Sequence, residues 1–142
     1  MKTVAQLLKT KAPGVISIKP DASVIDAVRL LAEKSIGAIL VLENERLVGI
    51  VSERDLARKV ALVGKSADEM RVSDIMTRQV LFVTPTHTNE ECMALMTDKR
   101  VRHLPVIDNG RVVGVLSIGD LVKDTICEQQ FIIEQLVNYI HR

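Results

Sequence analysis

The chain has 142 residues, of which 47% are hydrophobic, so its length suits one ordinary domain with a substantial core. Nineteen Lys and Arg residues against eighteen Asp and Glu residues give a net charge of +1, which argues against a dedicated nucleic-acid or membrane-surface binder. Trp is absent and only Phe82, Phe131 and Tyr139 are aromatic, which excludes an aromatic stacking platform for single-stranded nucleic acid.

Two further features favour a cytoplasmic protein without membrane contact. The longest uncharged apolar run, residues 36–42, is too short to cross a bilayer, and the N-terminus lacks the long apolar region of a signal peptide.

Cys92 and Cys127 belong to no metal-binding or redox spacing and fall in apolar helical patterns. We therefore interpret both cysteines as small hydrophobic residues.

The chain contains an internal repeat. Residues 15–56 align without a gap on residues 80–121 after a shift of sixty-five positions, with twelve identities. The identities gather at the end of each copy, in Gly49–Leu56 and Gly114–Leu121. Because repeats of this size seldom bury their apolar face alone, we expect the two copies to pack together around a shared core.

Each copy is predicted to open with a short helix and an extended stretch. The pattern Thr3-x-x-Gln6 is typical of a capping box before the first helix, and residues 72–76 repeat that helix in the second copy. Residues 15–18 and 80–83 form the extended stretches, each closed by a proline that suits the turn into the next helix.

A capped helix and a β-hairpin follow in each copy. Capping boxes are predicted to begin at Ser23 and Thr88. In the first copy the helix has an apolar face with the spacing of a buried surface, at Val24, Ala27, Val28 and Leu31. Asn109-Gly110 is a hairpin signal between two apolar runs. The predicted hairpins join residues 38–42 to 47–51 and residues 104–107 to 112–116.

A final helix is predicted after each hairpin. In the first copy Leu56, Val60 and Val63 share one face, before a polar linker over residues 64–71. In the second copy the helix runs from Asp120 to the end without Gly or Pro, over about 35 Å at about 1.5 Å per residue. Its apolar stripe comprises Val122, Ile126, Ile133, Leu136 and Ile140. Because this stripe is longer than a small domain needs, we expect a partner helix in a second chain, and hence a homodimer.

The order helix, strand, helix, hairpin and helix, given twice, resembles the cystathionine-β-synthase-type (CBS) domain. The segments most similar to those of bacterial members are Gly49–Asp55, Met93–Thr97, Arg100–Val106 and Gly114–Lys123. The resemblance covers essentially the whole chain. It implies an α/β (α+β) fold in which two tandem CBS domains pack as a pseudo-two-fold pair, a stand-alone Bateman module, with a long C-terminal helix added. The expected boundaries are residues 1–63 for the first domain, 64–71 for the linker, 72–126 for the second domain and 127–142 for the helical extension.

Both copies carry a Ser-x-x-Asp motif at the strand-to-helix turn, with Ser52 and Asp55 in the first and Ser117 and Asp120 in the second. Backbone N–H groups and a hydroxyl at a helix start attract phosphate, and a carboxylate can accept hydrogen bonds from both hydroxyls of a ribose. The same motif is also close to a plain capping box, which only holds the helix end. From the residues alone, both interpretations stay open.

The resemblance favours nucleotide binding. Members of the family bind adenosine nucleotides such as AMP, ATP or NAD in the cleft between the repeats. There the Asp of this motif typically binds ribose, and the Ser binds ribose or phosphate. Backbone groups at the positions of Ile18, Ala38, Val83 and Leu104 contact adenine in similar proteins. The expected nucleotide-binding residues are Ile18, Lys19, Ala38, Ser52, Arg54, Asp55, Val83, Arg100, Arg102, His103, Leu104, Pro105, Ser117, Gly119 and Asp120.

The second copy adds a basic cluster that the first copy lacks, made of Arg100, Arg102 and His103. Guanidinium groups suit phosphate because they are planar and always charged, although a solvated hairpin edge is the alternative interpretation. The resemblance implies that Arg54 reaches phosphate in the first copy. Its equivalent is Gly119, so the second motif is expected to take its phosphate donor from elsewhere, such as Arg100 or Arg102.

Catalytic interpretations have little support in the sequence. Ser117, His103 and Asp120 are residue types of a catalytic triad, but the glycine before the serine lies one residue too far away for a nucleophile elbow. Ser117 is also predicted to cap a helix. The three histidines share no metal-ligand spacing. We therefore expect no enzyme activity, no metal site and no catalytic cofactor.

These observations lead to one main hypothesis and two alternatives. The main hypothesis is a non-enzymatic regulatory sensor that binds an adenine nucleotide, AMP foremost and NAD(H) or ATP as options, and signals as a homodimer to an unknown protein partner. The first alternative is a structural dimerisation or adaptor module with vestigial ligand sites. The second is binding of another adenosyl compound, or of RNA through the basic cluster, although the near-neutral charge makes nucleic acid an unfavourable partner.

Overall fold

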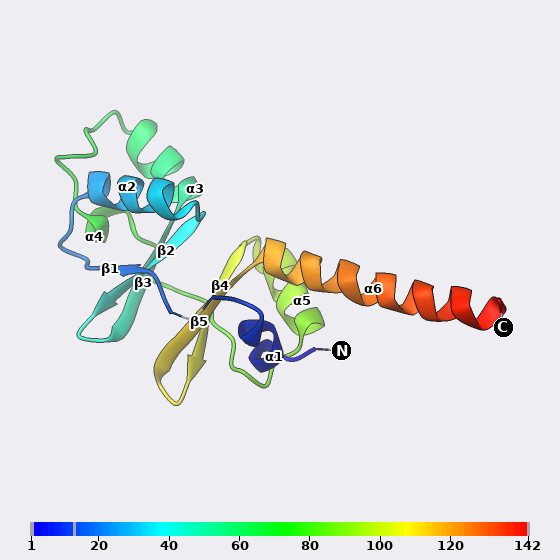
Figure 1. Cartoon of the computed structure of the whole chain (residues 1–142). Helices are drawn as coiled ribbons and strands as arrows, with labels where there is room; N and C mark the ends of the chain where they lie inside the picture. Colours follow the sequence, from blue (N-terminus) through cyan, green and yellow to red (C-terminus); the bar gives the residue numbers. More distant parts are fainter. Residues whose placement is uncertain (1, 13, 142) are drawn as a thin grey trace.

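The computed structural model describes residues 2–12 and 14–141 and has a mixed α+β fold (Figure 1). The elements in chain order are α1 (Val4–Lys9), β1 (Ser17–Ile18), α2 (Val24–Lys34), β2 (Ala38–Glu43), β3 (Arg46–Ser52), α3 (Glu53–Leu56), the π-helix η1 (Ala57–Ala61), α4 (Val72–Ile75), α5 (Asn89–Lys99), β4 (His103–Asp108), β5 (Arg111–Ser117) and α6 (Ile118–Ile140). The predicted fold class, hairpins and long C-terminal helix are confirmed.

Polar caps hold the helix starts where the sequence predicts them. Thr3 and Thr88 form capping boxes at the starts of α1 and α5. At the start of α2, Ser23 Oγ accepts the N–H of Asp26, but the structure shows no return bond from the Asp26 carboxylate to Ser23 within the described residues. That carboxylate lies 3.9 Å from Arg29 instead. The cap is therefore present at all three helices, and the reciprocal box at two of them.

The strands form two separate sheets, one in each half. In the first sheet β1 pairs in parallel with β2, and β2 pairs antiparallel with β3. The second sheet is the antiparallel hairpin of β4 and β5. In the hairpin turns Asn44, Glu45, Asn109 and Gly110 all have positive φ, as a two-residue type I′ turn requires.

The extended stretch of the second copy is reduced to a single bridge. Val83 makes an isolated parallel bridge to Val106 of β4, and no named strand forms over residues 80–83. Its N–H donates to Pro105 O at 3.0 Å, and its carbonyl accepts the N–H of Ile107 at 2.9 Å. The expected strand is therefore present as one residue, with both of its backbone polar groups hydrogen-bonded.

Two hydrophobic clusters form the core, and each receives its opening helix from the other copy. Val4 and Leu7 of α1 pack in the cluster of α5, β4, β5 and the first turn of α6. Val72 and Ile75 of α4 pack in the cluster of α2, β2 and β3. Figure 1 shows α1 beside the β4–β5 hairpin, far from the rest of the first copy. The packing units therefore do not coincide with the sequence repeats, and the exchange ties the two halves together.

Gly49 and Gly114 let the exchanged segments approach the hairpins closely. A Cβ atom at Gly49 of β3 would lie 2.6 Å from Sδ of Met76, which follows α4. A Cβ atom at Gly114 of β5 would lie 2.6 Å from Cδ2 of Leu8 in α1. The same contact is thus made twice in opposite directions, as the pseudo-two-fold arrangement requires. Glycine avoids these contacts, because a Cβ atom at either position would force the Met76 or Leu8 side chain to shift.

The segment between the copies packs against the first half. Ala67 and Met70 contact its hydrophobic cluster. Their carbonyl groups accept the N–H groups of Ile25 and Val24, at 3.1 and 2.9 Å. The predicted polar linker is therefore held in place by backbone hydrogen bonds and two apolar side chains.

Two expectations about burial need correction. Leu56 and Val60 pack against the first cluster, but Val63, assigned to the same face, is 56% exposed. Cys92 is buried in the second cluster, and burial raises the pKa of its thiol to about 11. Cys127 is exposed on α6. The interpretation as a small hydrophobic residue therefore holds for Cys92 and is wrong for Cys127, because α6 has left the core before it reaches that position.

The C-terminal part of α6 projects away from both sheets, as the orange-to-red ribbon in Figure 1 shows. Leu121 and Asp124 are buried, whereas residues 129–141 are all exposed. The exposed apolar side chains of α6 are Val122, Ile126, Phe131, Ile132, Ile133, Leu136, Val137, Tyr139 and Ile140. Among the described residues, no helix combines the length and the hydropathy of a membrane span.

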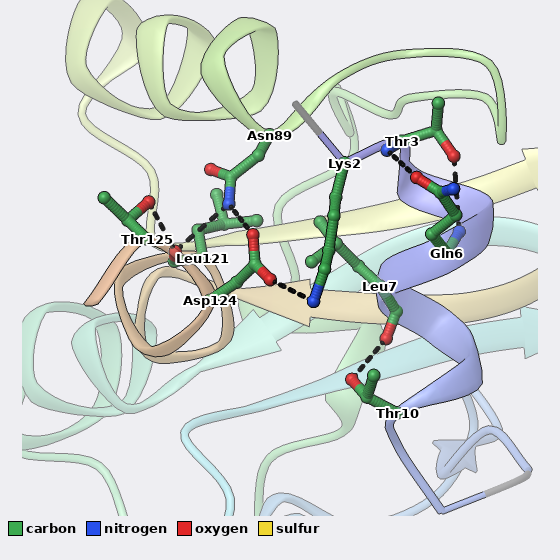
Figure 2. Close-up of polar contacts among 9 residues, drawn as sticks. All are labelled: Lys2, Thr3, Gln6, Leu7, Thr10, Asn89, Leu121, Asp124 and Thr125. Atoms are coloured by element: carbon green, nitrogen blue, oxygen red, sulfur yellow. Dashed lines mark hydrogen bonds and ion pairs between the residues drawn. The ribbon is translucent and has the colours of Figure 1, made fainter. Parts of the chain in front are cut away.

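A polar network anchors the start of α6 to the second half (Figure 2). Asn89 Nδ2, at the first position of α5, donates to Leu121 O at 3.1 Å and to Asp124 Oδ2 at 3.0 Å. Lys2 Nζ lies 2.7 Å from Asp124 Oδ1. Burial raises the pKa of Asp124, but the hydrogen bonds from Lys2 and Asn89 outweigh burial and hold this pKa below its usual range. The network therefore fixes the direction in which α6 leaves the core.

Candidate ligand-binding clefts

Two clefts lie where the halves meet, and we name them after their acidic residues. The Asp55 cleft has a volume of about 490 Å³ and is lined by Gly37, Ile50, Ser52, Glu53, Arg54, Asp55, Arg58, Lys59, Thr77, Arg100, Val101, Arg102 and His103. The Asp120 cleft has a volume of about 710 Å³ and is lined by Leu8, Lys11, Ala12, Gly14, Val15, Ile16, Lys34, Ser35, Ile36, Gly37, Ala38, His103, Val113, Gly114, Val115, Ser117 and Asp120. Both volumes fall within the range of roughly 300–1,000 Å³ that is typical of small-molecule sites.

The two clefts are built in the same way, with the copies exchanged. The Asp55 cleft combines the turn after β3 in the first copy with the loop before β4 in the second. The Asp120 cleft combines the turn after β5 with the loop before β2. A molecule in either cleft therefore contacts both copies of the repeat.

Both oxygens of the Asp55 carboxylate are engaged by protein donors. Oδ2 accepts the N–H of Ser52 at 2.9 Å and its hydroxyl at 3.1 Å. Oδ1 accepts Thr77 Oγ1 at 3.2 Å and lies 3.1 Å from Lys59 Nζ. Ser52 Oγ in turn accepts the N–H of Asp55 at 3.3 Å, which completes a capping box. The carboxylate is thus held firmly at the cleft wall.

The Asp120 carboxylate uses only one of its oxygens in this way. Oδ2 accepts the N–H of Ser117 at 2.8 Å and Lys11 Nζ at 2.7 Å. Lys11 Nζ also donates to Val115 O at 2.6 Å. Burial raises the pKa of Asp120, but Lys11 and Ser117 together outweigh burial and hold this pKa below its usual range. Within the described part of the chain, no hydrogen bond to Oδ1 is present, and the side chain is 28% exposed, against 11% for Asp55.

The capping interpretation of the Ser-x-x-Asp motif therefore describes both copies. Each serine caps its helix, and each aspartate returns the bond to the serine N–H. The two carboxylates differ, however, in the oxygen atoms that remain free to bind a ligand. The Asp120 carboxylate keeps an oxygen available to a hydroxyl group, whereas a ligand at Asp55 would have to displace Thr77 or Lys59.

The basic cluster lies in the Asp55 cleft. Arg100, Arg102 and His103 face this cleft together with Arg54, whose Nη1 donates to Arg100 O at 3.1 Å across the junction of the two copies. The expectation that Arg100 or Arg102 supplies a phosphate donor to the motif of Asp120 is therefore wrong. The physical reason is the exchange of the copies, because the loop before each hairpin faces the final turn of the other copy.

His103 lines both clefts and separates them. Its Cε1 and Nε2 atoms lie 3.2 Å from the place of a Cβ atom at Gly37, which also lines both clefts. Burial lowers the pKa of His103, and the charges of Asp120 and Glu53 offset this effect only in part. The cleft environment therefore favours the neutral form of the imidazole.

The remaining predicted residues divide into cleft positions, core positions and residues such as Lys19 and Gly119 that are exposed outside both clefts. Ser52 lines the Asp55 cleft, and Ala38 and Ser117 line the Asp120 cleft. Six predicted residues are absent from the linings of both clefts: Ile18, Lys19, Val83, Leu104, Pro105 and Gly119. Among these six, Val83, Leu104 and Pro105 are buried, so their side chains serve the core.

Three residues that were not predicted from the sequence contact the acidic side chains directly. Lys59 pairs with Asp55 from the same helical segment, and Lys11 and Thr77 reach their partners from the exchanged segments. Lys11 follows α1 and reaches Asp120 of the second copy, and Thr77 follows α4 and reaches Asp55 of the first copy. Both lie just after an opening helix that has crossed to the other half. The signal that could have identified them is the helix exchange, which no local pattern in the sequence reveals.

The clefts hold no recognisable catalytic arrangement among the described residues. Ser117 Oγ accepts the N–H of Asp120 at 3.2 Å, in the role of a helix cap, and no hydrogen bond joins it to His103 in this part of the chain. No group of three or more His, Cys, Asp or Glu side chains among residues 2–12 and 14–141 is placed to hold a metal ion.

Comparisons with known proteins agree with this architecture. The family model described as the CBS domain matches residues 4–62 and 72–125. The mitochondrial CBS domain-containing protein CBSX3 of Arabidopsis thaliana is 35% identical over 147 residues, which cover 97% of this chain and 71% of that protein. Two longer Arabidopsis relatives match over 25% and 24% of their own length.

Solved structures give the same result. The crystal structure of the CBS domain protein NE2398 is 54% identical, with a TM-score of 0.85, and the match covers 88% of this chain and 98% of that one. The structure of CBSX2 in complex with AMP is 28% identical, with a TM-score of 0.75, and the match covers 91% of this chain and 99% of that one. With two matched repeats and a fold shared over most of its length, the chain belongs to the CBS-domain family and carries two CBS domains in tandem.

Proposed function

We propose that this chain is a non-enzymatic sensor that binds an adenine nucleotide between its two CBS domains and passes the occupancy of its clefts to a protein partner. AMP is the leading candidate, with NAD(H) and ATP as alternatives. The observation that carries the proposal is that each cleft takes its lining from both copies of the repeat. CBSX2, which shares the fold, was solved with AMP.

Ligand binding in either cleft can change how the two halves pack, because the exchanged segments contact the strands that lead into the clefts. Gly49 lies in β3, three residues before Ser52, and contacts Met76 of the other copy. Gly114 stands in the same relation to Ser117 and contacts Leu8. A ligand that moves either turn also shifts a strand against an exchanged segment. The resulting coupling cannot exceed the difference in ligand affinity between the two arrangements, typically about 1–3 kcal/mol.

Within this proposal, Asp120 is the better acceptor for the two hydroxyls of a ribose. Its Oδ1 has no protein donor among the described residues, and its side chain is the more exposed of the two acids. Asp55 is engaged by Ser52, Thr77 and Lys59. We therefore assign the ribose to Asp120 first.

The test is calorimetric titration of nucleotide-stripped protein with AMP, ADP, ATP, NAD and NADH. We expect heat of binding for at least one of them below millimolar concentration, together with the same compound in the mass spectrum of small molecules released by denaturing freshly purified protein. Absence of heat for all five nucleotides would remove the sensor proposal.

The second candidate is a structural dimerisation module, and the projecting part of α6 favours it. Ile126, Ile133 and Ile140 are exposed and recur every seven residues, with Val122 and Leu136 on the same face, as in a helix that packs against another helix. Both candidates predict a homodimer. They differ in that Ile133→Glu should abolish the function of a scaffold, whereas Asp120→Ala should abolish only the function of a sensor.

A further inference from the structure

The two clefts differ most in their cationic side chains. When the two copies are aligned by the shift of sixty-five positions, several cationic residues of the Asp55 cleft correspond to uncharged residues in the other copy. Arg100 and Arg102 line the Asp55 cleft, and their equivalents in the Asp120 cleft are Ser35 and Gly37. Arg54 also lines the Asp55 cleft, and its equivalent is Gly119. Three cationic side chains of the Asp55 cleft therefore have uncharged equivalents in the other copy.

Ion pairs within the protein increase this difference in available positive charge. The Asp55 cleft is lined by five cationic side chains and two carboxylates, and the Asp120 cleft by two lysines and one carboxylate. Lys59 pairs with Asp55, and Lys11 pairs with Asp120. After these pairs are set aside, four arginines and Glu53 remain in the Asp55 cleft, and Lys34 alone remains in the Asp120 cleft.

The arginines of the Asp55 cleft are available to an anion. No carboxylate among the described residues forms an ion pair with Arg58, Arg100 or Arg102. All three are exposed, as is Arg54, so they lie at the mouth of the cleft and not in its depth. Arginine binds phosphate oxygens through paired, charge-assisted hydrogen bonds. Four such groups at one opening suit a chain of phosphates better than a single phosphate.

From this asymmetry we infer that the Asp55 cleft selects an adenine nucleotide with two or three phosphates, whereas the Asp120 cleft accepts a ligand with at most one. The inference rests on the proposed function and adds the ligand class of each cleft. Each further phosphate brings at least one more negative charge to the arginines of the Asp55 cleft. In the Asp120 cleft, the same charge would meet Lys34, the pair of Lys11 with Asp120, and no arginine.

The smaller size of the Asp55 cleft does not oppose this assignment, because the phosphate chain need not enter the cleft. Its volume of about 490 Å³ is smaller than that of the Asp120 cleft, but a phosphate chain would lie among the exposed arginines at the opening. Because these charges face solvent, their attraction to the ligand is screened by salt. Binding of the polyphosphate ligand should therefore weaken as ionic strength rises, and more steeply than binding of a monophosphate.

The experiment compares ATP, AMP and inorganic tripolyphosphate by calorimetry on the full chain, at two salt concentrations. The variant Arg58→Gln/Arg102→Gln removes two unpaired guanidinium groups from the Asp55 cleft. Lys34→Gln is the matched control, because it removes the free cation of the Asp120 cleft. All three positions are exposed, so the variants should fold.

We expect wild-type protein to bind ATP at least about tenfold more tightly than AMP, and the double variant to lose at least about tenfold in ATP affinity. Lys34→Gln should leave the affinity for ATP unchanged. Equal affinity for ATP and AMP, with no response to the double variant, would overturn the inference and leave the sensor proposal standing. Tripolyphosphate binding as tight as that of ATP would also overturn it, because the cleft would then recognise phosphate without the nucleoside. If no nucleotide binds, the proposed function fails together with the inference.

Discussion

Asp55 and Asp120 occupy the same place in the two copies, but they take their lysine partner from different parts of the chain. Asp55 pairs with Lys59, one turn later on the same helical segment, at 3.1 Å. The residue sixty-five positions after Lys59 is Asp124, so the second copy has no such lysine. Asp120 pairs instead with Lys11, which follows the exchanged helix α1, at 2.7 Å. A duplicated motif has thus kept its helix cap while its electrostatic partners have diverged.

The same substitution has a structural consequence at α6. Asp124 is free to bind Lys2 and Asn89, and these contacts hold the first two turns of the helix against the second half (Figure 2). In the first copy, Lys59 points its ammonium group at Asp55 and at Ile75 O, and the helix ends soon afterwards. One changed residue therefore accompanies both the different cleft chemistry and the different helix length of the two copies.

The largest effect that distinguishes the halves is expected from the glycines against the exchanged segments. The nearest atom to a Cβ lies at 2.6 Å in both cases, but at Gly49 two further atoms of Met76 follow at 2.9 and 3.1 Å, whereas at Gly114 the next atoms of Leu8 lie at 3.3 and 3.5 Å. Overpacking typically costs about 1–3 kcal/mol, so Gly49→Ala should lose about 3 kcal/mol and Gly114→Ala about 1 kcal/mol of unfolding free energy. Urea denaturation measures both values.

Gly119→Ala is the control for the glycine variants. A Cβ atom at Gly119 would make only an ordinary contact, 3.6 Å from Ser117 Oγ, in the first turn of α6. The alanine should therefore stabilise the helix by about 0.5–1 kcal/mol. Equal losses at Gly49 and Gly114 would show that the two exchanged segments are equally able to move aside, contrary to the contacts described here.

The second effect is expected at the acidic caps. Asp55→Ala leaves Thr77 and Lys59 without their carboxylate beside a nearly buried position, so it should cost about 2 kcal/mol. Asp120→Ala should cost about 1 kcal/mol, the usual value of a lost cap, because the Asp120 side chain is more exposed than that of Asp55 and has no equivalent of the Thr77 hydrogen bond among the described residues. Chemical denaturation without nucleotide checks the order. A larger loss at Asp120 would mean that the pair with Lys11 contributes more than the network around Asp55.

The sequence predicted local features well because each is encoded by adjacent residues. The cap at Thr88 and the turn at Asn109 depend on residues within four positions of one another, and both are present in the structure. The long C-terminal helix followed from the absence of Gly and Pro after Asp120. Such patterns survive folding because their energetic cause is local.

The sequence could not predict which copy faces which cleft. That arrangement depends on α1 and α4 crossing to the opposite halves, and their helical patterns are the same whichever core they enter. For this reason the sequence alone allows Arg100 or Arg102 as a phosphate donor for the Asp120 motif, whereas in the structure both line the Asp55 cleft. The role of Lys11 was missed for the same reason, since its partner lies 109 positions away in the chain.

A third and smaller effect concerns acid. The folded-state pKa of Asp120 lies below its unfolded value of about 3.9, so its contribution to stability is complete above that unfolded value. This contribution is lost as pH falls through the folded-state pKa. Asp120→Asn and Lys11→Gln should each flatten the loss of stability below about pH 4 in acid denaturation. Part of the slope should remain in both variants, because the pKa of Asp124 is lowered in the same way.

The smallest effect tests whether the two clefts communicate through His103. Burial lowers the pKa of this imidazole, while Asp120 from one cleft and Glu53 from the other raise it. Because the folded-state pKa is lowered, the unfolded chain takes up the proton first, and stability falls as pH drops below about 6.5. In an NMR titration, Asp120→Asn and Glu53→Gln should each lower the pKa of His103 further, while an anionic ligand in either cleft should raise it. A pKa of His103 that responds to only one of the two carboxylates would mean that the ring senses a single cleft, and the clefts would then bind their ligands independently at this contact.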